Sequence, residues 1–394
     1  MAEFPPLPFW FDDPEKSMNK ILFKLHGWMA LIAFVPLLVI CITGSILVFK
    51  HEIDALLIED RVRVDAAGRE RLSLDALADS VNSSFPNHEI VGWALFQDRG
   101  RADLVYTMER GTDEWTYALL NQYTGEPLRP PMGLTHHLTD WLLDLHYTLL
   151  LGDWGMLISS VFSILLCLLG ITGLILYRNF WKRFFTLCWD ARLMVYFSDL
   201  HKLVGTIGAP VLLILGFTGA WWNITHFAHE MEEHADGHAH QVMEQRLYSD
   251  RLSLQALHDQ AGEHIAGFEP TYITMPWEPG VNITFWGDVP SGNPLLSQYA
   301  SSVTFDAHSG EFQAAADIRE QSLGVKVVDS YRRLHFGDFA GVWSRVLWCI
   351  LGLSPLILSV TGLTLWYRRR EKRRKAREKR QWKKRAPAVA VSTP

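Results

Sequence analysis

Four long apolar runs dominate the hydropathy pattern of the chain. They cover residues 27–49, 154–177, 203–225 and 343–367, and none has Asp, Glu or Lys in its middle. Each is close to the roughly 20 apolar residues that a helix needs to cross a bilayer. The first run is too long for a signal sequence, and no small-residue cleavage site follows it. We therefore predict an α-helical membrane protein with a four-helix transmembrane bundle.

The two long segments between these runs have a different pattern. A helical pattern over 74–81 in the first segment, and over 254–264 in the second, precedes alternating β-rich stretches. The tetrapeptides Tyr-Thr-Gly-Glu (123–126) and His-Ser-Gly-Glu (308–311) resemble equivalent hairpin turns. Each segment is predicted to form a small α+β module, a helix against a short antiparallel sheet. No acid–base catalytic constellation is evident in either module.

The sequence also repeats itself. RLSLDAL at 71–77 matches RLSLQAL at 251–257 in six of seven positions, at an offset of 180. Further matches at offsets of 175 and 189 pair Leu25-His26 with Leu200-His201, Thr43-Gly44 with Thr218-Gly219, His51 with His226, Leu145-His146 with Leu334-His335, Gly152 with Gly341, Trp154 with Trp343, and Thr172-Gly173 with Thr361-Gly362. These matches predict an internal duplication of a helix–module–helix unit.

The duplication divides the chain into nine predicted segments. They are a cytoplasmic N-terminal segment (1–24), transmembrane helix 1 (25–50), periplasmic module 1 (51–142), transmembrane helix 2 (143–178), a cytoplasmic loop (179–199), transmembrane helix 3 (200–226), periplasmic module 2 (227–331), transmembrane helix 4 (332–367) and a basic cytoplasmic tail (368–394).

Charge sets the predicted orientation. Residues 368–385 contain 13 Lys or Arg and two Glu, although the whole chain has a formal charge of −6. By the positive-inside rule, this tail and the 179–199 loop lie in the cytoplasm and the modules lie on the opposite side of the membrane. We interpret the tail as a topology determinant near anionic lipid, and we expect no nucleic-acid partner.

The four cysteines exclude thiolate chemistry in the modules. Cys41, Cys167 and Cys349 lie in apolar runs, and Cys188 lies in the cytoplasmic loop. Neither module therefore has a thiol for a disulfide, an iron–sulfur cluster or a thiolate metal site. Any redox chemistry there must use other ligands.

Histidines stand at the ends of the apolar runs. His26 and His201 each have small residues four and seven positions later: Ala30 and Ala33 after His26, and Gly205 and Gly208 after His201. This spacing puts an imidazole and a strip without bulky side chains on one helix face, as a haem held by two histidines requires. Close packing of membrane helices is the competing explanation, and it accounts for the small residues but not for the paired histidines.

Topology sorts these histidines by side. His26 and His51 are separated by about 37 Å of helix at roughly 1.5 Å per residue, so one haem cannot serve both ends. We assign His26 with His201 to the cytoplasmic side and His146 with His335 to the exported side. The alternative keeps His51 and His226 as ligands, in partnership with His146 and His335, and spacing alone does not choose between the two.

A histidine-rich tract, THFAHEMEEHADGHAHQ, follows the third run. It contains His226 and His229 among several acidic residues and could bind a transition metal. A flexible solvated loop is an equally good interpretation. The chain has no GxGxxG after a strand, no P-loop and no flavin fingerprint. Electrons must then come from a separate donor, a quinol or a cytoplasmic reductase.

These features carry a family resemblance. The Leu-His, Gly-x-Trp and Thr-Gly pattern, with the RLSL and TGE pieces, resembles the PepSY-associated transmembrane family over about residues 20–370, and within it the siderophore reductases of the FoxB and PiuB type. The resemblance implies two haem b groups per chain, with His26, His146, His201 and His335 at the family's Leu-His positions. It implies a bacterial inner-membrane enzyme, both termini cytoplasmic, that reduces ferric siderophore iron in the periplasm and releases Fe(II).

Two other functions remain compatible with the sequence. One is a non-enzymatic binding or regulatory membrane protein, whose PepSY-like modules sense or inhibit a periplasmic partner. The other is a cupric reductase, which the histidine tract favours slightly. Haem content distinguishes the binding or regulatory protein from a reductase, because histidines that only lie at the membrane interface would bind no haem.

Overall fold

The computed structural model describes residues 14–58, 62–66, 68–178, 193–235 and 242–385. Over these residues, four stretches are helical, long and apolar enough to cross a membrane, and they overlap the four predicted runs. These candidate spans are Met18–Leu47, Gly152–Leu176, Leu193–Glu232 and Gly341–Trp382. The protein is therefore a multi-pass membrane protein with an additional antiparallel sheet region.

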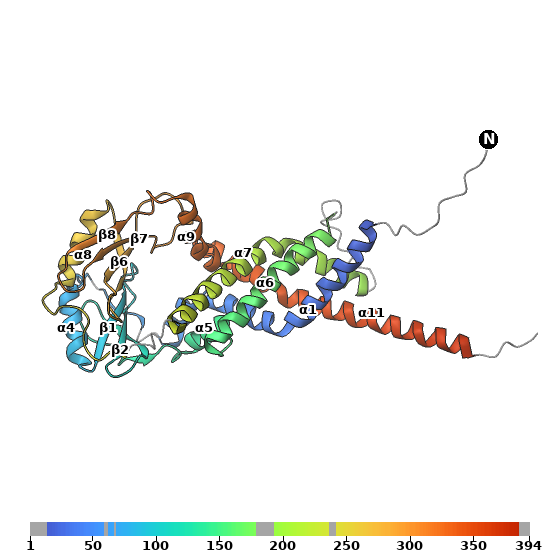
Figure 1. Cartoon of the computed structure of the whole chain (residues 1–394), viewed down its shortest axis with the longest axis horizontal. Coiled ribbons are helices and arrows are strands. Elements are labelled where there is room, and N and C mark those ends of the chain that lie inside the picture. Colours follow the sequence, from blue (N-terminus) through green and yellow to red (C-terminus); the bar gives the residue numbers. More distant parts are fainter. Residues whose placement is uncertain (1–13, 59–61, 67, 179–192, 236–241, 386–394) are drawn as a thin grey trace, which may run out of the picture. The chain divides into compact units, whose positions relative to one another are not determined.

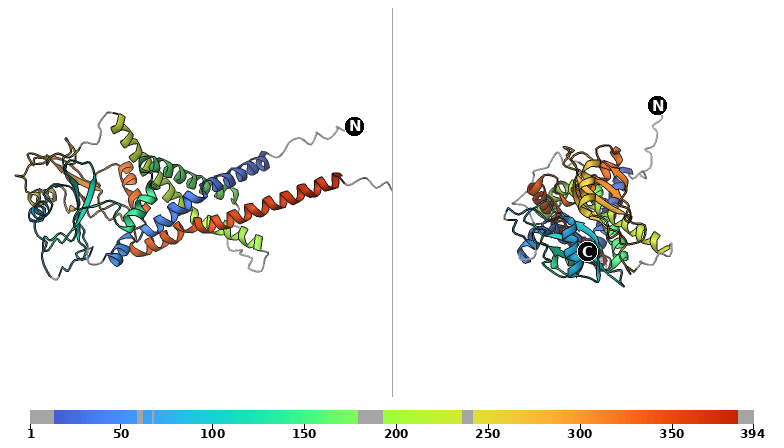
Figure 2. Two further views of the ribbon diagram at one scale, coloured as in Figure 1. Left: turned by 90° about the horizontal axis from the view of Figure 1, so that it is seen from below. Right: turned by 90° about the vertical axis from the view of Figure 1, so that its left-hand side faces the viewer.

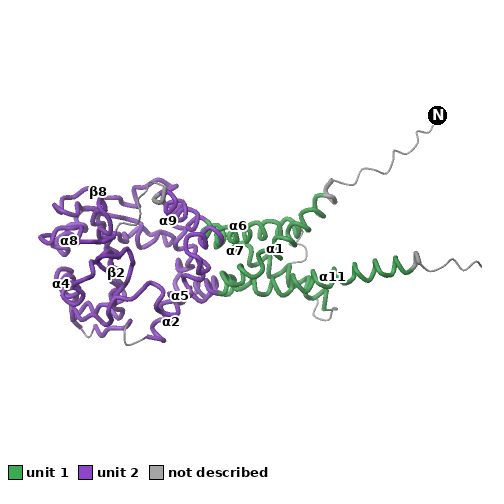
Figure 3. The backbone as a smooth tube through the Cα atoms, turned by 60° about the horizontal axis from the view of Figure 1, so that its bottom comes forward, with its two compact units in different colours: residues 1–42, 159–220, 350–394 green, residues 43–158, 221–349 purple. Residues whose placement is uncertain are grey.

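The chain divides into two compact units, which Figure 3 shows in different colours. Unit 1 comprises residues 1–42, 159–220 and 350–394, and unit 2 comprises residues 43–158 and 221–349. Parts of four predicted segments lie outside the described residues: 1–13 of the N-terminal segment, 179–192 of the loop with Cys188, 236–241 of the histidine tract with His238 and His240, and 386–394 of the tail.

Unit 1 is helical, with residues from α1 (Pro14–Leu47), α6 (Gly152–Leu176), α7 (Leu193–Ala235) and α11 (Ser354–Arg385). Its core brings together Ala33 and Leu37 of α1, Leu166 of α6 and Leu212 of α7, with Leu358 of α11 packed against them. Large apolar side chains remain exposed on other faces, as Ile32 does at 65%. Exposed apolar faces are expected of helices that contact lipid.

Unit 2 contains one antiparallel sheet in the order β4-β3-β2-β1-β5-β6-β7-β8. The strands are β1 (His88–Ala94), β2 (Asp103–Glu109), β3 (Trp115–Leu120), β4 (Met132–Gly133), β5 (Glu269–Thr274), β6 (Ile283–Asp288), β7 (Ser301–Phe305) and β8 (Phe312–Ala316). The two predicted modules each supply four strands and join where β1 pairs with β5, with Trp93 opposite Ile273. They therefore share one sheet.

Two helices cover one face of this sheet (Figures 1 and 2). These are α4 (Leu74–Ser84) and α8 (Leu254–His264), at the positions where the sequence predicts them. Trp93, Phe285 and Phe305 of the sheet are fully buried in the core beneath them. This single core, drawn from both halves of the sequence, holds the sheet together.

The N-termini of α4 and α8 also cap one another. Asp75 of α4 accepts a hydrogen bond of 2.6 Å from the backbone N–H of Leu254, and Gln255 of α8 accepts one of 3.0 Å from the N–H of Leu74. A helix N-terminus leaves several backbone N–H groups without partners inside the helix, and side-chain oxygens satisfy them. The exchange of caps fixes the two helices against each other.

The two predicted hairpin turns are confirmed. Gly125 and Gly310 adopt left-handed backbone angles, with φ of 76° and 75°. Their N–H groups donate to the carbonyls of Asn121 and Asp306, at 2.8 and 3.0 Å. Only glycine adopts this conformation without a steric penalty, which explains the repeated Gly in the two tetrapeptides.

Short helices precede the second and fourth spans. The sequence predicts one helix from residue 143, but α5 (Leu138–Tyr147) ends before α6 begins at Gly152. Likewise α9 (Leu323–Phe336) ends at Gly337, ahead of α10 (Gly341–Gly352). Gly152 and Gly341 have positive φ of 59° and 64°, so the Gly of the Gly-x-Trp motif turns the chain between the two helices. Leu145-His146 and Leu334-His335 therefore lie on short helices outside the spans.

Candidate metal centres at paired histidines

His26 of α1 is held by a threonine of α6. Its Nδ1 lies 2.8 Å from Oγ1 of Thr172, and that hydroxyl also lies 2.6 Å from the carbonyl oxygen of Leu168 on its own helix. Because the single hydroxyl proton is donated to this carbonyl, Oγ1 accepts the second bond and Nδ1 of His26 donates it. This tautomer leaves Nε2 of His26 with a lone pair, as a metal ligand needs.

His201 of α7 has the same arrangement with α11. Its Nδ1 lies 2.8 Å from Oγ1 of Thr361, and this hydroxyl donates to the carbonyl of Ile357 at 2.7 Å. His201 therefore also donates from Nδ1 and keeps a free lone pair on Nε2. Both histidines of the first predicted pair therefore lie in unit 1.

Glycine follows each of these threonines and gives the imidazole room. A Cβ on Gly173 would lie 3.6 Å from Cε1 of His26, and one on Gly362 would lie 3.2 Å from Cε1 of His201. The repeated Thr-Gly dipeptide therefore combines an acceptor for Nδ1 with a surface against which the ring can pack. The sequence shows these dipeptides, but only the structure assigns them this role.

His146 and His335 form the second pair, in unit 2. Oγ1 of Thr43 lies 3.2 Å from Nδ1 of His146, and a Cβ on Gly44 would approach Cε1 of His146 to 2.7 Å. The ring centroids of His146 and His335 are 6.3 Å apart. Trp222 of α7 packs on the other imidazole, 5.2 Å from the His335 centroid.

The 6.3 Å separation of the centroids is chemically informative. Imidazole nitrogens bind metal ions at about 2.0–2.1 Å, so two rings on opposite sides of one ion have centroids roughly 6 Å apart. Burial, together with the charge of His146, lowers the pKa of His335 to about 3. His335 is therefore a neutral imidazole at physiological pH, the form that binds metals.

The other predicted ligands are not paired in this way. His51 packs edge-on against Phe96, with 6.5 Å between the ring centroids. His226 is exposed, and its Nε2 lies 3.6 Å from Glu230. His229 is exposed one turn further along α7. Over the part of the chain that the structure describes, no group of three or more His, Cys, Asp or Glu is placed to hold a metal ion.

The predicted strips of small residues serve helix packing in this structure. Ala33 is fully buried in the core of unit 1. A Cβ on Gly208 would lie 2.6 Å from Oγ of Ser354, and one on Gly205 would lie 3.5 Å from Leu358. The competing explanation that small residues allow close approach of helices thus accounts for these positions.

Comparison with known proteins places this geometry in context. The family described as PepSY-associated TM region matches residues 23–369. The uncharacterized protein PA4219 of Pseudomonas aeruginosa is 26% identical over 258 residues, which is 59% of this chain. The match spans 64% of the length of that relative.

Proposed function

The chain belongs to the PepSY-associated transmembrane family, and on that premise we propose that it is a haem b reductase that moves electrons across the membrane. The observation that carries the proposal is the repeated threonine–histidine hydrogen bond. Each such bond fixes Nδ1 as the donor and leaves Nε2 of a partly buried imidazole without a proton. Metal-binding histidines are commonly oriented in this way by a second hydrogen bond.

The proposed ligands are two pairs. His26 and His201 would hold one haem b in unit 1, and His146 and His335 would hold a second in unit 2. Bound haem supplies one-electron chemistry between ferric and ferrous iron. The chain itself orients the imidazoles through their threonine partners and packs the apolar ring of Trp222 against His335. A separate quinol or cytoplasmic reductase would supply the electrons.

A ferric siderophore is the proposed substrate. Hard oxygen donors bind Fe(III) far more tightly than Fe(II), so reduction of the iron releases it from the chelate. This reaction needs a reducing electron near the chelate and no general acid or base. We propose that it occurs in the periplasm, beside two PepSY-like modules that arose by duplication.

Orientation follows from the same reasoning. We propose that both termini lie in the cytoplasm and that the protein lies in the inner membrane, because the basic residues at the end of α11 favour the cytoplasmic side by the positive-inside rule. Unit 2 with its sheet then belongs to the periplasmic side.

The first experiment is a spectrum of the full-length protein, purified in detergent from haem-replete cells. We expect a sharp α-band of low-spin haem b after reduction with dithionite, and about two haems per chain in a pyridine haemochrome assay. Adding a ferric siderophore to the reduced protein should then oxidise the haem. Absence of haem would refute the proposed function and leave the histidines as interfacial residues.

A further inference from the structure

The face of the sheet opposite α4 and α8 carries a row of aromatic side chains. Successive side chains of a strand alternate between faces, so the neighbours of buried Val105 and Ile273 point away from the helices. They include Tyr106 of β2 and Tyr272 of β5, which are half-buried, with ring centroids 6.2 Å apart. The row extends to Tyr299, whose ring centroid lies 6.4 Å from that of Tyr272.

Gly92 of β1 leaves the space that these rings occupy. A Cβ at this position would lie 2.3 Å from the hydroxyl oxygen of Tyr272 and 3.4 Å from Tyr106. Any side chain here would displace the Tyr272 hydroxyl from its place over the strand. Because Gly92 has no side chain between the two tyrosines, their rings form a flat aromatic surface on this face, which we call the aromatic floor.

Two arginines stand at the edge of this floor. The guanidinium of Arg332 on α9 lies 4.7 Å from the Tyr299 ring and 4.9 Å from the Phe336 ring. The guanidinium of Arg101 lies 3.4 Å from the Phe96 ring and interacts electrostatically with Asp54 first, and then with Tyr299, Asp98 and Tyr106. Both arginines are half-buried, and burial lowers the pKa of Arg101.

Among the described residues, neither guanidinium forms a direct ion pair, and Arg101 has only longer-range electrostatic contact with Asp54 and Asp98. Over the described residues, no ion pair or side-chain hydrogen bond engages Arg101 or Arg332, and the hydroxyls of Tyr106 and Tyr272 also have no hydrogen-bond partner. The nearest carboxylates are already engaged, because Asp54 and Asp140 hold Lys50 at 2.9 and 2.6 Å. Partly buried guanidinium groups without a partner are costly. Their positions fit an anionic ligand that supplies oxygen acceptors.

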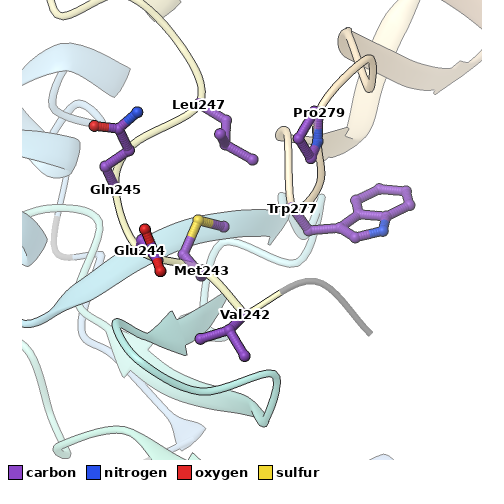
Figure 4. A pocket seen from close by; sticks show the side chains of 7 residues that line it. All are labelled: Val242, Met243, Glu244, Gln245, Leu247, Trp277 and Pro279. Atoms are coloured by element: carbon purple, nitrogen blue, oxygen red, sulfur yellow. The ribbon is translucent and has the colours of Figure 1, made fainter. Parts of the chain in front are cut away.

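The opposite end of the aromatic row differs. Tyr106 contacts Trp115 at 6.2 Å, and Trp115 contacts Trp277 at 5.8 Å. Trp277 lines a hollow together with Met243 and the carboxylate of Glu244 (Figure 4). A carboxylate there disfavours an anion, whereas the other end of the row carries two guanidinium groups that form no direct ion pair with any described residue.

The arginine end is also the end next to the second histidine pair. Phe336, which Arg332 contacts, lies 6.0 Å from the His335 ring, and Arg332 is three residues before His335 on α9. Residues three apart on a helix share a face. A ligand bound to Arg332 and Tyr299 would therefore lie close to His335, one of the two proposed ligands of the haem that would reduce it.

We propose that Arg101, Arg332, Tyr106, Tyr272 and Tyr299 form the docking surface for an anionic ferric chelate with oxygen donors. This inference rests on the proposed function and narrows its substrate to negatively charged chelates. The guanidinium groups and tyrosine hydroxyls donate hydrogen bonds to the chelate oxygens, and the rings pack against its flat faces.

The test measures binding separately from reduction. Gallium(III) replaces iron in these chelates and accepts no electron from the protein, so full-length protein in detergent can be titrated with gallium complexes by calorimetry. The probes are gallium enterobactin, an anionic catecholate, and gallium desferrioxamine B, a cationic hydroxamate. We expect the anionic probe to bind more tightly, and its affinity to fall about tenfold or more in Arg101→Gln and in Arg332→Gln.

A matched control lies two residues away. Arg99 is exposed in the same loop as Arg101, so Arg99→Gln changes the net charge equally and should leave the affinity nearly unchanged. Tyr272→Phe keeps the ring and removes only the hydroxyl. It should lower the affinity for gallium enterobactin a few-fold. Equal binding of the two probes, or equal losses in Arg99→Gln and Arg101→Gln, would overturn the docking surface.

Haem content and midpoint potential are measured on the same variants. If Arg332→Gln shifts the haem potential but leaves gallium enterobactin binding intact, Arg332 serves a haem propionate and the inference is wrong. If the wild type contains haem and reduces ferric chelates, but neither arginine variant changes the affinity for gallium enterobactin, the inference is wrong and the proposed function stands. If arginine-dependent binding is found without haem, the docking surface stands and the reductase fails.

Discussion

Thr361→Val tests the hydrogen bond on which the metal centre in unit 1 depends. Valine matches threonine in shape and replaces only the hydroxyl that holds His201 at 2.8 Å. Thr361 is 2% exposed, so water does not readily replace the lost acceptor. Nδ1–H of His201 then loses its threonine acceptor, and the ring is freer to rotate or change tautomer.

The size of the effect follows from burial. An unsatisfied buried donor costs about 1–3 kcal/mol, which corresponds to roughly five- to 150-fold in affinity. Loss of an outer-shell partner typically reduces metal affinity by about 10–100-fold. We therefore expect haem affinity at the first pair to fall within this range. We also expect the midpoint potential to rise, because the weaker donor stabilises Fe(III) less.

The assay is a haem titration with a parallel redox titration of the purified variant. Thr364→Val is the matched control, since Thr364 lies three residues later on α11 and its hydroxyl donates only to the carbonyl of Val360, at 2.8 Å. It reproduces the change in helix propensity without touching a histidine. Equal affinity and potential in Thr361→Val, Thr364→Val and the wild type would refute the role of threonine.

Four further variants probe the rest of the molecule. His335→Ala should remove one of two haems in a haemochrome assay while His226→Ala removes none, and the reverse result would restore the alternative ligand set. Gly44→Ala should weaken the same haem, because its Cβ would lie 2.7 Å from His146; an unchanged spectrum would contradict the steric argument. Glu89 is 1% exposed and pairs with two arginines. Glu89→Ala should therefore destabilise unit 2 by about 3 kcal/mol in urea unfolding, and an unchanged midpoint would contradict it.

The spans and the two helices of the sheet region follow from local sequence patterns. An apolar run of sufficient length predicts a span from composition alone. Ser73 and Ser253 cap α4 and α8 where the RLSL repeat places them. These features depend on residues close together in sequence, which is why the sequence predicts them.

Features that depend on distant residues were not predictable in the same way. The pairing of β1 with β5, which makes one sheet of two modules, rests on backbone hydrogen bonds between segments about 180 residues apart. The sequence contains both strands but no local signal that they are neighbours. Leu149 and Leu150 have φ of 53° and 61°, values that leucine rarely adopts, so the break between α5 and α6 has no glycine signal at those positions.

The histidines show the same division. Their repetition identifies them as candidates, but spacing along the sequence does not choose between His146 and His51. The structure supplies a reason to prefer His146, because it brings His146 to 6.3 Å from His335 and places His51 against Phe96. The threonines were recognised only as a repeated dipeptide, since their role requires a partner on another helix.

The arrangement of partners also explains why both motifs recur. His26 bonds Thr172 and His146 bonds Thr43, all within the first half of the sequence, and His201 bonds Thr361 within the second. These three imidazoles are thus oriented by threonines of their own half, whereas each proposed metal centre takes one histidine from each half. A substitution in a Thr-Gly dipeptide should therefore weaken one ligand of one centre and leave the other centre intact. Two Thr-Gly variants in opposite halves, Thr172→Val and Thr361→Val, should act on the same haem, whereas Gly44→Ala should act on the other. Their spectra in single and double combinations would separate the two centres without removing any ligand.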